Sequence, residues 1–333
     1  MLVQSGAGQA SGFPDESYAA VGAEIVADAA TIWSQAELIV KVKEPQVQEY
    51  ALLRRDQIVF GYFHFAALRE LTEVCLDAGV VALAFETLRD RAGRLPLLTP
   101  MSEVAGKMSI QEGAKYLERP MMGRGILLGG VPGVEPAEVL VLGAGTVGGN
   151  AAKIAAGLGA NVILMDVSLD RLRYLSEIMP ANVATVFCDP HAVDHYVQRA
   201  DLVIGSVLVP GDRAPHLVNA SQVRSMKPGS VIVDVCIDQG GCVETSTPTT
   251  HADPTYLVDD VVHYCVTNIP GAVARTSSQA LANATGPYVL EIANNGLDAF
   301  LARDDGRAAA LNIRAGKIQH PGLAHALSDL PAA

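Results

Sequence analysis

The sequence predicts an α/β protein of two Rossmann-like domains, each built on a parallel sheet, with long helices linking them. Three observations carry this prediction. Short apolar segments alternate with helical segments along most of the chain, as in a parallel sheet covered by helices. A glycine-rich turn at 143–148 stands between an apolar segment and a helical one. The length of 333 residues corresponds to two domains at roughly 150 residues each.

Composition and charge narrow the class of protein. Half of the residues are hydrophobic and 18% are charged, which is sufficient for two apolar cores. The formal net charge of −12 argues against a basic groove for nucleic acid. The five cysteines include no CxxC pair, so we expect free thiols and no metal site. We find neither a signal-peptide pattern nor an apolar run approaching ~18 residues, and we expect a soluble, cytoplasmic protein.

The first part of the chain alternates strands and helices. The apolar segment Leu38–Pro45, which ends in charge and a proline, is a predicted strand, and Gln57–His64 is another that ends on a histidine. The other predicted elements are short strands at 1–3 and Glu24–Val26, a strand at Val80–Phe85, and helices near Asp15–Val21, Ala27–Gln35 and Leu68–Ala78. We expect Asp15 or Ser17 to cap the first of these helices.

The second part repeats the alternation after a long helix from about Pro100 to Leu117 and a loop rich in Gly and Pro over 123–136. A helix is predicted at Asn150–Leu158, and strands at Glu138–Leu142, Val162–Met165, Thr185–Cys188, Leu202–Ser206, Val231–Cys236 and Val262–Val266. The last segment, from Ser278 onward, is predicted to be mainly helical and to pack on the first domain. The predicted domains are therefore residues 1–97 with 275–333, and residues 98–274.

The strongest motif is a GxGxxG turn that follows an apolar strand and precedes a helix. Gly143 would make the tight turn, Gly145 would let a pyrophosphate approach the backbone, and Gly148 would let helix and strand pack closely. The N-terminus of the helix offers free N–H groups to the phosphates. Asp166 ends the next strand, where a carboxylate binds the adenosine ribose and repels a 2′-phosphate. NAD is therefore favoured over NADP, although the nearby Arg171 keeps the second cofactor open.

Three polar residues, Lys43, His64 and Asp238, stand at the ends of predicted strands. Each has an ordinary explanation by itself: a solvated lysine, a structural histidine, and an aspartate that forms a turn before two glycines. Ligands of open α/β sheets bind outside the carboxyl ends of the strands. Together with a nucleotide site in the same chain, the three side chains therefore indicate catalysis.

Nine segments, in order along the chain, resemble the alanine dehydrogenases. They are KVKEP (41–45), MSEVAG (101–106), LLGGVPG (127–133), GAGTVG (143–148), ADLVIGSVLVP (200–210), VDVCIDQGGC (233–242), PTTH (248–251), YCVTNIP (264–270) and ANATGPYVL (282–290). The same fold occurs in the nucleotide-binding subunit of proton-translocating transhydrogenase. The IDQGGC segment, with Lys43 and His64, is closer to the dehydrogenase.

The resemblance implies a role for individual residues. Lys43 would hold the substrate carboxylate and carbonyl, with Glu44 orienting it. His64 would be the acid/base, and Asp238 would work with it from the nucleotide-binding domain. The residues that the resemblance and the GxGxxG turn place around the cofactor are Ser102, Gly143, Gly145, Thr146, Val147, Gly148, Asp166, Arg171, Ser206, Val207, Leu208, Ile237, Asp238, Asn268 and Ile269.

The activity that the resemblance implies is the reversible, NAD-dependent oxidative deamination of L-alanine to pyruvate and ammonia. Residues 1–97 with 275–333 would then bind the substrate, and residues 98–274 would bind NAD. A histidine suits the proton transfers because its ordinary pKa is roughly 6.5. The resemblance also implies a homo-oligomer, a hexamer in the family.

The start of the chain departs from the family pattern. Family members begin earlier, with a strand, a helix and an arginine that binds the substrate carboxylate, and we expect the natural protein to begin before Met1. A bidentate arginine is the better partner for a carboxylate. Two alternatives therefore stay open: a homologue that binds NAD but is catalytically impaired, and a transhydrogenase-like nucleotide-binding subunit that serves a membrane partner on a separate chain.

Overall fold

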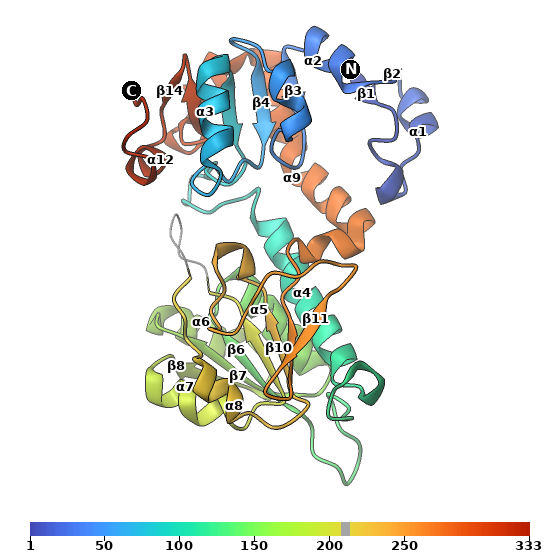
Figure 1. The fold of residues 1–333 in the computed structure, drawn as a ribbon, viewed down its shortest axis with the longest axis vertical. Coiled ribbons are helices and arrows are strands. Elements are labelled where there is room, and N and C mark those ends of the chain that lie inside the picture. Colours follow the sequence, from blue (N-terminus) through green and yellow to red (C-terminus); the bar gives the residue numbers. More distant parts are fainter. Residues whose placement is uncertain (208–213) are drawn as a thin grey trace. The chain divides into compact units, whose positions relative to one another are not determined.

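The computed structural model describes residues 1–207 and 214–333, which divide into two compact units (Figure 1). Unit 1 consists of Met1–Met101 with Val273–Ala333, and unit 2 of Ser102–Ala272. Both ends of the chain therefore build unit 1, and a continuous middle segment builds unit 2. Within the described residues, we find no helix with the length and apolar character needed to cross a membrane.

Unit 1 is organised around a five-stranded sheet of order β14-β13-β5-β4-β3. Its strands are β3 (Leu38–Val40), β4 (Ile58–Gly61), β5 (Val81–Ala84), β13 (Leu311–Arg314) and β14 (Lys317–Ile318). The first three are parallel, as predicted, whereas β13 and β14 pair antiparallel. The expectation of a mainly helical last segment is wrong at 311–318. There Ala315 and Gly316 both have positive φ and form a two-residue hairpin turn.

The two faces of this sheet bury separate apolar clusters, because successive strand residues point to opposite faces. Val59 of β4 joins the cluster formed with α2 (Ala29–Gln35) and α3 (Arg69–Ala78). Its neighbour Phe60 joins the cluster formed with α9 (Ala274–Asn295) and α10 (Leu297–Leu301). Both side chains are fully buried, and burial of a side chain of this size contributes about 1.5–3 kcal/mol. The helices thereby fix the strand ends that carry the polar residues discussed below.

A separate two-stranded parallel sheet in unit 1 consists of β1 (Leu2–Gln4) and β2 (Glu24–Val26). The predicted helix cap is wrong, because Pro14 occupies the cap position of α1 (Asp15–Ala19) and the Asp15 carboxylate instead accepts hydrogen bonds from Ser5 Oγ and Gly6 N. The other short elements of unit 1 are the 3-10 helices η1 (Gln9–Ser11) and η2 (Val47–Leu52) and the helices α11 (Asp305–Ala308) and α12 (Pro321–Ala326).

Unit 2 has a seven-stranded sheet of order β11-β12-β10-β9-β6-β7-β8. Its strands are β6 (Glu138–Leu142), β7 (Asn161–Asp166), β8 (Val183–Phe187), β9 (Leu202–Gly205), β10 (Val231–Asp234), β11 (Thr255–Val258) and β12 (Val261–Tyr264). All are parallel except β11, which forms a hairpin with β12 across Asp259 and Asp260, two residues of positive φ. The chain runs outward from β6 to β8 and then resumes at β9 on the other side of β6. This reversal of strand order is the topological switch point at which doubly wound sheets bind dinucleotides.

Helices cover the sheet of unit 2 and connect its strands. They are α4 (Thr99–Tyr116), α5 (Thr146–Gly157), α6 (Leu169–Ile178), α7 (Pro190–Val197) and α8 (Ala220–Arg224), with the 3-10 helices η3 (Arg119–Met121), η4 (Ile237–Gln239) and η5 (Ile269–Val273). The helix predicted at Asn150 begins four residues earlier, at Thr146, within the glycine motif. The motif therefore supplies the first turn of the helix as well as the loop before it.

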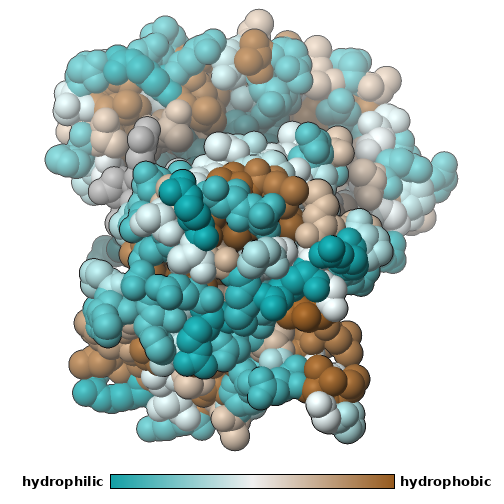
Figure 2. All heavy atoms as spheres, turned by 60° about the horizontal axis from the view of Figure 1, so that its bottom comes forward, coloured by the Kyte–Doolittle hydropathy of each residue, from teal (hydrophilic) through white to brown (hydrophobic). Residues whose placement is uncertain are grey.

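The face drawn in Figure 2 is mainly hydrophilic, with separate hydrophobic patches. One group of exposed apolar side chains lies on the loop that follows α4 and η3. Its members, Leu127, Val131 and Val134, are each more than half exposed. Apolar side chains gathered on one loop are typical of a surface that contacts another chain.

Candidate functional site

The structure of the protein itself requires two of the three glycines in the turn of unit 2, Gly143 and Gly148, and does not require the third. Gly143 has φ +95°, in the left-handed region that favours glycine. A Cβ on Gly148 would lie 1.8 Å from the Gly143 carbonyl oxygen, so only glycine lets α5 approach β6 this closely. A Cβ on Gly145 would meet no atom within 4 Å, although this residue has an ordinary φ of −67°. The protein itself therefore does not require glycine at 145, which is the position where a bound pyrophosphate would approach the backbone.

The first turn of α5 is free to bind an anion. No side chain caps the helix at Gly145, and the first helical residue, Thr146, is exposed. The next residue, Val147, is half-buried. Uncapped N–H groups at a helix N-terminus, at the carboxyl end of the strand before it, form a phosphate-binding arrangement.

Asp166 and Arg171 both contact the backbone of this turn. The Asp166 carboxylate accepts hydrogen bonds from Ala144 N at 2.7 Å and from Ser168 N at 2.8 Å. Arg171 Nε donates to the Ala144 carbonyl oxygen at 2.7 Å. A carboxylate thus lies beside the turn, where it can accept from ribose hydroxyls, and a guanidinium lies close by. The Asp166 carboxylate is compatible with the ribose of NAD. The Arg171 guanidinium would lie near the 2′-phosphate if NADP were bound instead.

At the switch point, Ser206 follows β9 and forms hydrogen bonds with the end of β6 and the glycine turn. Its buried hydroxyl lies 2.8 Å from the Leu142 carbonyl oxygen and 2.9 Å from that of Gly143. The hydroxyl proton is therefore engaged by the glycine turn itself. Val207 is half-buried beside it, and the predicted cofactor residue Leu208 lies outside the described residues. Of the other predicted cofactor residues, Ser102 lies in the first half of α4, and Asn268, with φ +59°, and the buried Ile269 follow β12.

The loop after β10 carries Asp238 and is held by a residue that the sequence did not single out. Asp238 is exposed within η4 and has no hydrogen-bond partner among the described residues. Behind it, the fully buried Asp234 carboxylate accepts from the backbone N–H groups of Cys242 at 3.0 Å and Val243 at 3.2 Å. It also accepts from the Cys236 thiol at 3.0 Å. Asp234 thereby closes the loop at both ends and presents Asp238 outward.

The Cys242 thiol beside Asp234 stays protonated. The contact with Cys236 and burial both raise the pKa of the Cys242 thiol well above its usual range. A thiol S–H group can donate a hydrogen bond to a carboxylate, which is the role that Cys236 has towards Asp234. The loop is therefore held by donors from its backbone and from a side chain.

In unit 1, Lys43 and His64 follow the parallel strands β3 and β4, and both side chains are exposed. The predicted strand ending at His64 stops at Gly61, because His64 has φ +52° and cannot continue a strand. The half-buried Glu44 bonds to the side chain of Gln46 at 3.1 Å, and no ion pair joins it to Lys43 in the described part of the chain. The neighbouring Lys41, not singled out by the sequence, forms an ion pair with Glu49.

A third residue at this edge, Glu86, was also missed. It follows β5, the neighbour of β4, and its Oε1 accepts hydrogen bonds from Phe63 N at 2.9 Å and His64 N at 2.6 Å. The carboxyl ends of β3, β4 and β5 thus bring Lys43, His64 and Glu86 to one edge of one sheet. A lysine, a histidine and a carboxylate together can bind an anionic group and transfer protons.

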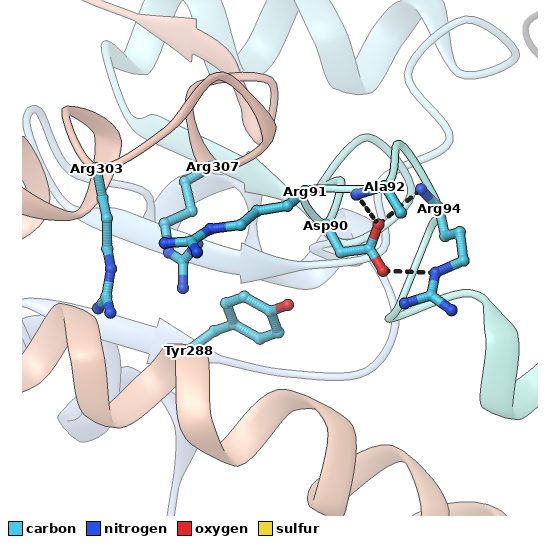
Figure 3. A pocket seen from close by; sticks show the side chains of 7 residues that line it. All are labelled: Asp90, Arg91, Ala92, Arg94, Tyr288, Arg303 and Arg307. Carbon is cyan, nitrogen blue, oxygen red and sulfur yellow. Dashed lines mark hydrogen bonds and ion pairs between the residues drawn. The ribbon is translucent and has the colours of Figure 1, made fainter.

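Unit 1 also contains a cavity of about 520 Å³, which holds neither Lys43 nor His64. Figure 3 shows the residues that line it: Asp90, Arg91, Ala92, Arg94, Tyr288, Arg303 and Arg307. The Arg307 guanidinium lies over the Tyr288 ring, 5.4 Å from its centroid. Most of the charged side chains that line this cavity have a partner of opposite charge. Arg94 pairs with Asp90, and Arg303 pairs with Glu291.

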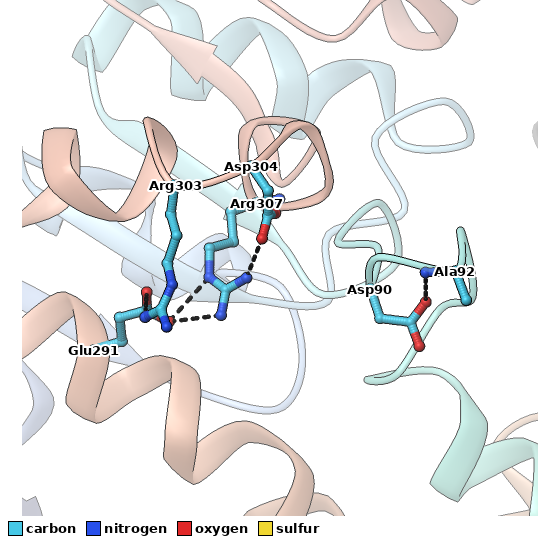
Figure 4. Close-up of polar contacts among 6 residues, drawn as sticks. All are labelled: Asp90, Ala92, Glu291, Arg303, Asp304 and Arg307. Carbon is cyan, nitrogen blue, oxygen red and sulfur yellow. Dashed lines mark hydrogen bonds and ion pairs between the residues drawn. The ribbon is translucent and has the colours of Figure 1, made fainter.

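Arg307 has a structural role in this cluster. It bonds through Nε to Glu291 at 3.0 Å and through Nη1 to Asp304 at 2.5 Å (Figure 4). Burial opposes ionisation of Glu291, but hydrogen bonds from Arg303 and Arg307 lower the pKa of its carboxyl. Arg307 is therefore not a solvated surface residue, since its side chain is only 17% exposed.

We expect Arg307→Ala to destabilise unit 1. The change would leave two carboxylates without their partner and remove the packing on Tyr288, at a cost of about 2–3 kcal/mol. Arg94→Ala, in which a 78% exposed side chain is lost, should cost less than about 1 kcal/mol. Urea denaturation of both variants measures the difference, and equal midpoints for the two would show that the Arg307 network contributes nothing particular.

The second described cavity, of about 480 Å³, lies at the other end of the sheet of unit 2. Its lining includes Glu138 and Asn161, which begin β6 and β7. It also includes Asp201, which pairs with Arg124 and Lys227. Because ligands of doubly wound sheets bind at the carboxyl ends of the strands, this cavity is not the dinucleotide site.

Comparison with known families places the whole chain in one group. The family model described as "Alanine dehydrogenase/PNT, N-terminal domain" matches residues 1–105, and "Alanine dehydrogenase/PNT, C-terminal domain" matches residues 109–321. The alanine dehydrogenase of Halomonas elongata is 53% identical over 326 residues, which are 98% of this chain and 88% of that protein. The alanine dehydrogenase of Bacillus subtilis is 50% identical over 329 residues, covering 98% of this chain and 86% of the relative.

Solved structures agree with the sequence comparison. A structure of L-alanine dehydrogenase matches with a TM-score of 0.94 at 50% identity, covering 98% of this chain and 90% of the other. A transhydrogenase structure from Sinorhizobium meliloti matches with a TM-score of 0.80 at 25% identity, covering 96% of this chain and 90% of the other. Both structure and sequence are thus more similar to the dehydrogenase than to the transhydrogenase.

Proposed function

This chain belongs to the alanine dehydrogenase/PNT family, and we propose that it catalyses the reversible, NAD-dependent oxidative deamination of L-alanine to pyruvate and ammonia. One observation of the structure carries the proposal. A glycine-rich turn with the Asp166 carboxylate bonded to its backbone occurs in the same chain as a lysine and a histidine at the carboxyl ends of parallel strands. The high identity to several alanine dehydrogenases supports the choice of substrate.

The residues of unit 2 fit a nicotinamide dinucleotide. The open space at Gly145 and the uncapped start of α5 would hold the pyrophosphate, and Asp166 would hold the adenosine ribose. The cofactor accepts a hydride from the α-carbon of the amino acid when bound. We propose NAD rather than NADP because the Asp166 carboxylate would repel a 2′-phosphate, even with Arg171 nearby.

The reacting groups of the protein have separate tasks in this proposal. Lys43 binds the carboxylate of alanine and polarises the carbonyl of pyruvate in the reverse direction. Loss of a hydride from the α-carbon and a proton from the amino group gives an imine. His64 or Asp238 then takes a proton from the water that adds to the imine and returns one to the departing ammonia. The net products are pyruvate, ammonium, reduced cofactor and one proton.

We favour a dehydrogenase over a transhydrogenase-like subunit because identity to the solved L-alanine dehydrogenase is twice that to the solved transhydrogenase, 50% against 25%. A homo-oligomer, a hexamer by resemblance, is part of the proposal. The exposed apolar side chains of Leu127, Val131 and Val134 support association with another chain. Light scattering of the purified protein measures the oligomeric state.

An initial-rate assay with L-alanine tests the function. We expect the near-ultraviolet absorbance of reduced nicotinamide to rise with NAD and to rise far less with NADP. D-alanine is the matched control substrate, because it has the same groups in the opposite configuration. A rate with NADP equal to that with NAD would overturn the assignment of Asp166 as a discriminating residue. NAD binding without any turnover would favour the catalytically impaired alternative.

A further inference from the structure

His64 has a backbone conformation that is uncommon among residues with a side chain. Its φ of +52° lies in the left-handed region, which is uncommon for residues other than glycine. Such a conformation persists only where the surrounding structure holds it, and it is frequent at functional sites. The direction of the imidazole depends on it, because a change to negative φ would swing the Cα–Cβ bond away from its present direction.

Glu86 is the side chain that holds this conformation. Its Oε1 accepts from two consecutive N–H groups, those of Phe63 at 2.9 Å and His64 at 2.6 Å. Two donors that converge on one oxygen fix the peptide between these residues. Glu86 is itself well placed, because the residue before it, Phe85, is buried and its N–H donates to the Gly61 carbonyl oxygen at 2.9 Å.

The neighbours of His64 limit movement in other directions. Phe63 and Phe65, on either side, are buried, and their rings stack with centroids 4.5 Å apart. The His64 carbonyl oxygen accepts from Ala67 N at 2.9 Å. The Tyr62 ring lies nearly parallel to the imidazole, with centroids 6.1 Å apart. The polar anchor in this arrangement that a single substitution can remove is Glu86.

The second oxygen of Glu86 argues against a purely structural role. Oε2 is buried and has no hydrogen-bond partner among the described residues. An unpaired buried carboxylate oxygen is unfavourable for folding, and such exceptions call for an explanation. A role of Glu86 in placing His64 for catalysis would explain why the protein keeps this carboxylate. The unfavourable free energy of burying Oε2 would then be offset by a gain in function.

We propose that Glu86 is a positioning residue for the reaction, acting through the backbone of His64. The inference rests on the proposed function, because it requires His64 to be the acid/base. Without Glu86, the backbone of His64 would relax towards negative φ, and the imidazole would leave the position from which it exchanges protons with the substrate. A misplacement of about 1 Å can lower a rate by roughly a hundredfold.

The experiment compares Glu86→Ala, Glu86→Gln and Glu73→Ala, a control on α3 whose half-exposed carboxylate pairs with Arg69. We expect Glu86→Ala to lower kcat for L-alanine by roughly a hundredfold, with the Kd for NAD unchanged. Glu86→Gln should keep most of the rate, because an amide oxygen still accepts both N–H groups. Glu73→Ala should behave as the unmodified protein. If Glu86→Gln were as impaired as Glu86→Ala, the proposal that the side-chain oxygen at position 86 acts by accepting the two N–H groups would be overturned.

Hydrogen exchange provides a readout that does not depend on turnover. In Glu86→Ala, the amides of Phe63 and His64 should exchange faster than in the unmodified protein, while those of β4 and β5 stay protected. Unchanged exchange at both amides would overturn the proposed hold on His64. If the unmodified protein has no activity with L-alanine, the proposed function fails, and the exchange experiment still decides whether Glu86 holds His64.

Discussion

Replacement of His64 or Asp238 by alanine is expected to lower turnover of L-alanine by roughly 10²–10⁴-fold, the usual contribution of an acid/base group. NAD affinity should stay within a small factor of the original. Both side chains are exposed, and neither has a hydrogen bond from its side chain to a described residue, so their loss removes no structural contact of that kind. Lys43→Ala should also lower kcat/KM strongly, with a rise in KM, because the lysine binds the substrate carboxylate.

Controls for these variants are available on exposed surfaces. His191→Ala on α7 and Asp170→Ala on α6 change the same residue types at exposed positions and should leave the rate unchanged. Steady-state kinetics with L-alanine and a separate titration with NAD distinguish catalysis from cofactor binding. Full activity in Asp238→Ala would show that the reacting groups have been assigned to the wrong residues.

The second large effect is expected at Gly145, which we contrast with Gly148. Because a Cβ at 145 would meet no protein atom within 4 Å, Gly145→Ala should fold with an unchanged melting temperature. It should nevertheless bind NAD at least about tenfold more weakly, the equivalent of about 1.4 kcal/mol, because the methyl group takes the space of the pyrophosphate.

Gly148→Ala should fail in a different way. Its Cβ would lie 1.8 Å from the Gly143 carbonyl oxygen and 2.6 Å from Ser206 Oγ, so α5 and the turn must separate. We expect a loss of stability of at least about 1–3 kcal/mol together with a loss of binding. Thermal denaturation and calorimetric titration of both variants separate the two causes. A Gly145→Ala protein that binds NAD as tightly as the original would contradict the placement of the pyrophosphate.

The parts of the fold that the sequence predicted are those with a local signal. The parallel strands of both units follow from short apolar segments between helices, and the glycine turn follows from its spacing and context. The hairpins β11–β12 and β13–β14 were missed as strand pairs. Their turns consist of Asp259-Asp260 and Ala315-Gly316. All four residues have positive φ, but neither pair is the Asn-Gly or Asp-Gly sequence that marks a two-residue hairpin turn most strongly.

Residues that act through the backbone left no signal in the sequence. Glu86 and Asp234 are carboxylates just after β5 and at the end of β10, and each accepts two backbone N–H groups from a loop beside it. No spacing rule marks such a residue, because its partners are set by which strands lie side by side. Arg307 was missed for the same reason, since Glu291 comes from a different helix. Sequence patterns identify residues that face a ligand more readily than they identify the residues that hold those ligand-facing residues in place.

The measurement that tests the central claim most directly is the joint release of pyruvate and reduced cofactor from L-alanine and NAD at alkaline pH. We predict equal amounts of pyruvate, ammonia and NADH from the unmodified protein, and formation of the same products roughly 10²–10⁴-fold more slowly by His64→Ala. Tight NAD binding with no pyruvate or ammonia formed would contradict the account and leave a nucleotide-binding protein without this activity.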